Sequence, residues 1–97
     1  MSDYAWIIDT GSEEIGLEDD AGTKGPADAP DNLLAILELM QDSGTKFEML
    51  DDDGEQYYTG RIIGAFWSDE PLHDFGTPNA GCTEIRYFTE IKKYEGI

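Results

Sequence analysis

One short segment of this chain has helical periodicity, and it lies among segments with the composition of β-strands. Leu33, Ile36, Leu37 and Met40 are spaced i, i+3, i+4 and i+7, which places them on one apolar stripe of a helix. Pro30 suits a first helical turn, and Gly44 can end a helix because it adopts the left-handed conformation easily. The sequence therefore predicts a helix at about residues 30–42.

Segments rich in aromatic and β-branched residues flank this helix and predict strands. We expect strands at residues 4–8, 45–50, 55–67 and 82–88, with the tail 90–97 as a possible extension of the last strand. Residues 51–54 indicate a hairpin turn, and residues 10–27 and 68–81 indicate long loops. The order β-α-β-β-β predicts a single α+β domain over residues 1–97. One helix packs on one face of an antiparallel sheet of about four strands. The other sheet face is either solvated or binds a partner.

The helix is more apolar than one covering layer requires. We favour a deep two-layer core over which loop 10–27 folds, and the alternative is an apolar contact with a partner or a second copy. The protein is accordingly expected to be a monomer or a weak dimer. Adjacent aromatic pairs occur at Tyr57-Tyr58, Phe66-Trp67 and Tyr87-Phe88. One member of each pair should enter the core, and the other either packs across strands or forms an aromatic binding face.

Charge narrows the choice of partner. The chain has 22 acidic residues against 6 Lys and Arg, a net charge of −16 on 97 residues. Direct contact with a nucleic-acid backbone needs clustered cations, so this class of ligand is disfavoured, as are anionic membranes. A basic protein surface is the favoured partner, and nucleic-acid-binding proteins commonly have such a surface.

Three observations favour a cytoplasmic protein that does not enter a membrane. No stretch approaches the roughly 18 apolar residues of a membrane span. The N-terminal residues lack the positive region of a signal peptide. Cys82 is the only cysteine and has no internal disulfide partner.

Catalytic and metal-binding patterns are weak throughout. His73 and Cys82 could be imagined as a catalytic pair, but a buried structural cysteine is the favoured interpretation. The acidic turn at residues 51–55 fails the calcium-loop pattern, because Met49 and Gly60 occupy the first and last ligand positions. The chain contains no phosphate-binding glycine motif. We therefore expect a protein that is not an enzyme, with no catalytic residue, no cofactor and no metal.

The candidate site is the set of acidic residues in the two loops and the turn. Averaged over about 5,500 Å² of surface, 22 acids are too sparse to imitate DNA, so they would have to gather on one face. The candidate partner-binding residues are Glu13, Glu14, Glu18, Asp19 and Asp20 in the first loop, Asp51, Asp52, Asp53 and Glu55 in the turn, and Asp69, Glu70 and Asp74 in the second loop.

Three functional interpretations remain open. The first is an inhibitor that occupies a nucleic-acid-binding groove by DNA mimicry. The second is an acidic interaction module with a different basic partner. The third is a domain whose charge is an adaptation to a saline environment.

Two segments of the chain resemble sequences of a known protein family. They are KFEMLDDDGEQYYTGRIIG at 46–64 and EPLHDFGTPNAGCTEIRY at 70–87. In these segments the chain resembles a family of small acidic proteins encoded by bacteria and their phages, a family without an established activity. The resemblance implies a phage or mobile-element origin, and with it a counter-defence role such as inhibition of a CRISPR effector or a restriction enzyme. It assigns no role to any residue.

Overall fold

The computed structural model describes residues 3–64, 69–88 and 94–96 of the chain. These residues form a six-stranded sheet with the strand order β2-β1-β4-β3-β5-β6, in which every pairing is antiparallel. The strands are β1 (Ala5–Gly11), β2 (Lys24–Gly25), β3 (Thr45–Leu50), β4 (Gln56–Ile63), β5 (Glu84–Phe88) and β6 (Tyr94–Gly96). The expected α+β class with an antiparallel sheet is confirmed, and the sheet has six strands where about four were expected.

The β3–β4 hairpin sits at the centre of the sheet, where the sequence predicted it. Its turn is closed by the Asp51 carboxylate, which accepts hydrogen bonds from the backbone N–H groups of Asp53 and Glu55, both at 2.9 Å. Gly54 completes the turn with a φ of 81°, a conformation that costs glycine little. The expected strand at 55–67 is observed as Gln56–Ile63, and its last residues, 65–67, lie outside the described residues.

The main core lies on one face of the sheet, beneath a helical segment that the sequence analysis had assigned to a loop. This segment comprises the π-helical turn η2 (Leu72–Gly76) and the short helix α2 (Thr77–Ala80). Leu72, Phe75 and Ala80 pack from it onto the sheet. The buried residues of this cluster are Trp6, Ile8, Phe47, Met49, Tyr58, Ile62, Leu72, Cys82, Ile85 and Tyr87. The prediction of a loop at 68–81 was therefore wrong for its larger part.

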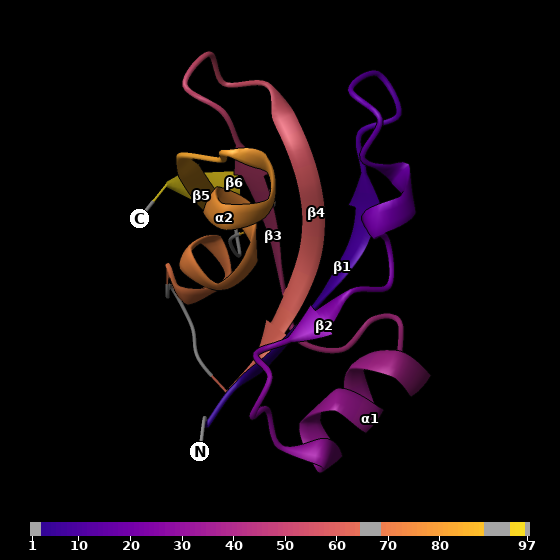
Figure 1. The fold of residues 1–97 in the computed structure, drawn as a ribbon. Helices are drawn as coiled ribbons and strands as arrows, with labels where there is room; N and C mark the ends of the chain where they lie inside the picture. The colour runs from indigo at the N-terminus through magenta and orange to yellow at the C-terminus, as the bar shows by residue number, and fades with distance from the viewer. Residues whose placement is uncertain (1–2, 65–68, 89–93, 97) are drawn as a thin grey trace.

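The helix α1 (Asp31–Leu39) lies at one end of the molecule and covers only part of the opposite sheet face (Figure 1). Leu37 packs there against Ala5 and Ile7, with Leu33 and Leu34 around them. The expected two-layer core centred on this helix, with loop 10–27 folded over it, is not what forms. That loop instead contains the single turn η1 (Glu18–Asp20) and the edge strand β2.

In each aromatic pair that the structure describes, one ring is fully buried and its neighbour is more exposed, although Tyr57 packs against the same core cluster as Tyr58. Tyr58 and Tyr87 are fully buried, whereas Tyr57 is half-buried and Phe88 is exposed. Phe66 and Trp67 lie outside the described residues. Cys82 is buried, as expected, although β5 begins two residues later at Glu84.

Candidate acidic binding surface

Two of the three acidic segments leave the sheet at the same end. The last residue of β1, Gly11, pairs with Tyr58 near the start of β4, and the last residue of β3, Leu50, pairs with Gln56. The Ser12 N–H then donates to the Tyr57 carbonyl oxygen at 2.9 Å. As a result, the loop after β1 and the β3–β4 turn project side by side, at the end of the molecule opposite α1 (Figure 1).

We call this region the acidic end. It holds nine of the twelve candidate residues, namely Glu13, Glu14, Glu18, Asp19, Asp20, Asp51, Asp52, Asp53 and Glu55. The register of the central strands therefore unites two groups of acids that are separated by about thirty residues in the sequence.

Asp20 is tied into the fold. Its Oδ2 accepts a hydrogen bond from the Tyr58 hydroxyl at 2.6 Å and another from Asn79 Nδ2 at 3.1 Å. Asn79 Nδ2 also lies 2.9 Å from the Tyr58 hydroxyl oxygen, to which it donates. Burial raises the pKa of Tyr58, and the hydrogen bond to Asp20 raises it further. Asp20 thus joins η1 to β4 and α2.

Asp51 is also engaged, because its carboxylate closes the hairpin turn. Tyr57 stands beside it, and the pKa of Tyr57 is raised by desolvation, by Asp51 and by Glu55. Neither Asp20 nor Asp51 is therefore a free contact residue.

The other seven carboxylates of the acidic end are exposed. Within the described part of the chain, none of them forms a side-chain hydrogen bond or an ion pair. They are Glu13, Glu14, Glu18, Asp19, Asp52, Asp53 and Glu55. Their charge is available to a partner.

The third candidate group lies elsewhere, near the residues that lead into β1. Asp74 Oδ2 accepts hydrogen bonds from the Tyr4 hydroxyl at 2.7 Å and from Trp6 Nε1 at 3.1 Å. Burial raises the pKa of Tyr4, and hydrogen bonds to Glu70 and Asp74 add to the rise. Asp69 lies 2.9 Å from His73 Nε2 on the exposed side of the same segment. Glu70 and Asp74 thus connect this segment to Tyr4, Asp69 pairs with the exposed His73, and none of the three belongs to the acidic end.

The buried Arg61, which makes several side-chain hydrogen bonds, was not among the residues that the sequence singled out. Its side chain is 4% exposed and makes a bidentate contact with Asp9, at 2.9 Å through Nε and 3.0 Å through Nη2. The guanidinium also donates to the carbonyl oxygens of Leu37, Met40 and Ser43, where α1 ends. An arginine inside the otherwise apolar strand segment 57–63 was the signal that could have revealed it.

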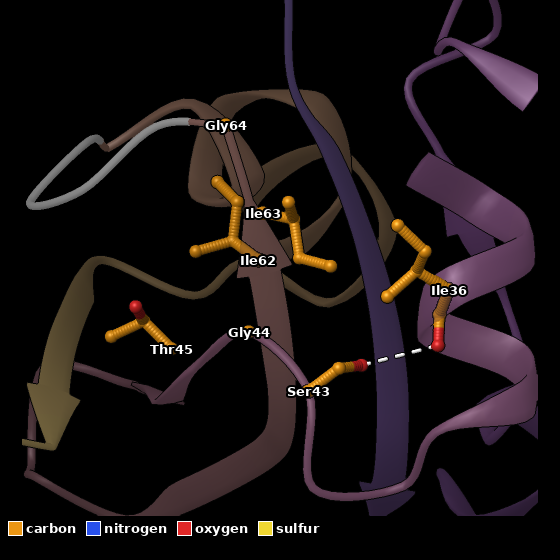
Figure 2. Close-up of a pocket in the computed structure, with 7 residues that line it drawn as sticks. All are labelled: Ile36, Ser43, Gly44, Thr45, Ile62, Ile63 and Gly64. Carbon is orange, nitrogen blue, oxygen red and sulfur yellow. Dashed lines mark hydrogen bonds between the residues drawn. The ribbon is translucent and has the colours of Figure 1, made fainter. Parts of the chain in front are cut away.

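In the part of the chain that the structure describes, two hollows lie beside α1, and neither brings together a reactive set of side chains. The first, of about 500 Å³, is lined by Ile36, Ser43, Gly44, Thr45, Ile62, Ile63 and Gly64 (Figure 2). Its Ser43 hydroxyl is already used, because it lies 2.6 Å from the Met40 carbonyl oxygen and 3.2 Å from that of Ile36. The second, of about 460 Å³, includes Lys46 and Arg61, but the Arg61 donors are taken up by Asp9 and the end of α1.

The His73 and Cys82 side chains do not form an activated pair. His73 is exposed beside Asp69, whereas Cys82 belongs to the main core. Burial, with a smaller contribution from Asp51, raises the pKa of the Cys82 thiol to about 11. The thiol is therefore protonated at neutral pH and packs as a small apolar group. Among residues 3–64, 69–88 and 94–96, no group of three or more His, Cys, Asp and Glu side chains could hold a metal ion.

Of the helices that the structure describes, none has the length and apolar character needed to cross a membrane. Comparison with known proteins finds no matching family model, no similar curated protein and no similar solved structure.

Proposed function

We propose that this protein acts by binding, and that its acidic end docks on a basic protein surface. The observation that carries the proposal is the convergence of seven exposed carboxylates, from two separate segments, at one end of the sheet. Such a concentration of like charge has no stabilising role in the folded chain. It attracts a cationic surface over a distance set by the ionic strength, about 8 Å in physiological salt.

The positively charged side chains support the same proposal. Most of those that the structure describes form ion pairs with acids that do not belong to the seven exposed carboxylates of the acidic end. Arg61 pairs with Asp9, Lys24 with Glu38, and Arg86 with Glu84. The acidic end keeps its negative charge, which disfavours nucleic acid as the direct ligand and favours a protein that itself binds nucleic acid.

The sharpest form of the proposal is an inhibitor from a phage or mobile element that covers the nucleic-acid-binding surface of a host defence complex. A CRISPR effector or a restriction enzyme would supply such a surface. The clustered carboxylates support this form, and the expected resemblance of two segments to small acidic proteins of bacteria and their phages motivates it. An acidic interaction domain with a partner outside defence is the alternative.

The test is capture of partners from a bacterial lysate by the wild-type protein and by two charge variants, followed by elution with a salt gradient. The first variant removes three exposed acids of the acidic end, by Glu13→Gln, Glu14→Gln and Asp52→Asn. The matched control removes three exposed acids elsewhere, by Asp3→Asn, Asp31→Asn and Asp42→Asn. Both variants carry the same net charge, so a difference between them reports where the charge lies.

We expect a nucleic-acid-binding protein to elute from the acidic-end variant at lower salt than from the wild type and the control. Added duplex DNA should displace that partner from the wild type. If both variants release the partner at the same salt concentration, binding depends on the net charge alone. That outcome would contradict docking through the acidic end. A captured partner that DNA does not displace would favour the alternative, an acidic interaction domain whose partner has no role in defence.

A further inference from the structure

We draw no further inference here: the strongest candidate, the exposed apolar side of α1 formed by Ile36, Leu39 and Met40 beside the hollow of Figure 2, carries none because nothing in the structure shows what covers it.

Discussion

At the scale of single residues, Asp19 and Asp20 show how neighbouring carboxylates take different roles. Asp20 accepts hydrogen bonds from Tyr58 and Asn79, whereas Asp19 is exposed and makes no such contact among the described residues. A buried hydroxyl that loses its acceptor retains its desolvation cost, so the two positions differ in stability although their chemistry is the same.

Asp20→Ala should lower the free energy of unfolding by about 1–3 kcal/mol, because the fully buried Tyr58 loses its acceptor. Asp19→Ala should change it by less than about 0.5 kcal/mol. Urea unfolding of both variants checks the expectation. Equal losses would mean that Asp20 does not hold η1 against β4 and α2.

Buried and partly buried hydroxyl and thiol groups predict a loss of stability in alkali. Burial raises the pKa of Cys82 from 9.0 to about 11, and it raises the pKa values of Tyr4 and Tyr58 above 10.0. The folded protein then keeps protons that the unfolded chain releases. The free energy of unfolding should therefore be unaffected by these groups below about pH 9 and fall from there towards about pH 11.

Urea titrations at about pH 8 and about pH 10.5 measure this fall. In Cys82→Ala, the decline should begin only near about pH 10, where the unfolded tyrosines start to ionise. A free energy of unfolding that is the same at both pH values in the wild type would contradict the burial of these groups.

Single-residue roles were the least predictable part of the site. Sequence patterns identified all twelve acids as candidates, but the partners that engage Asp20 and Asp74 lie 38 and 70 residues away from them. Side-chain chemistry gives no information on such pairings until the strand register is known. The charge of the acidic end was predictable, whereas its division into structural and free carboxylates was not.

At the scale of elements, α1 was predicted in the right place but three residues too long at its C-terminal end. Met40 leaves the helix with φ −120° and ψ 96°, and its carbonyl oxygen accepts from Ser43 and Arg61. The apolar stripe continues to Met40, so periodicity alone predicts a longer helix. The end is instead set by side chains that cap the last carbonyl groups from outside the helix.

The two leucines Leu37 and Leu39 test which side of α1 is packed. Leu37 is 0% exposed and Leu39 is 83% exposed. Leu37→Ala should lower the free energy of unfolding by about 2–5 kcal/mol, and Leu39→Ala by less than about 0.5 kcal/mol. Chemical denaturation of the pair is the measurement. A large loss from Leu39→Ala would show that this side is covered in solution.

The helical segment over the main core was predicted as a loop, because its glycines and prolines are typical of loops and its helical periodicity is short. Leu72, Phe75 and Ala80 fall close to a helical repeat and pack on the sheet, while Pro71 and Pro78 lie at helix starts, where proline is tolerated. Gly76 allows close packing, because a Cβ there would lie 2.6 Å from Met49 Sδ. These residues therefore mark a packed helix, whereas the sequence analysis took them as signs of a loop.

At the scale of the whole molecule, the accessible surface is 5570 Å², which matches the roughly 5,500 Å² expected of a monomeric protein of this mass. The fold therefore reaches ordinary compactness despite a net charge of −16. The free acids of the loop after β1 and of the hairpin turn project from one end of the sheet, whereas Glu18 and Asp19 lie on η1, which folds back beside β1.

Mutual repulsion at the acidic end should make stability depend on salt. The variant with Glu13→Gln, Glu14→Gln and Asp52→Asn should gain on the order of 1 kcal/mol in free energy of unfolding at low salt, and the gain should shrink near 1 M salt. The control variant should gain less, because Asp31 stands at the N-terminus of α1, where a negative charge is favourable.

Thermal or urea unfolding across a salt series measures both variants. A gain that persists at high salt would mean that the substitutions act by something other than screening. A steep rise of wild-type stability up to molar salt would favour adaptation to a saline environment as the origin of the charge.

If the free acids at the end opposite α1 outweigh the other charges, they would act on a cationic partner as the negative pole of an electric dipole. In the field of a cationic partner, such a dipole experiences a torque as well as an attraction. The protein would turn its loops towards the partner before the two surfaces touch. Fewer collisions would then be wasted in wrong orientations, and the rate of association would benefit more than the strength of the final complex.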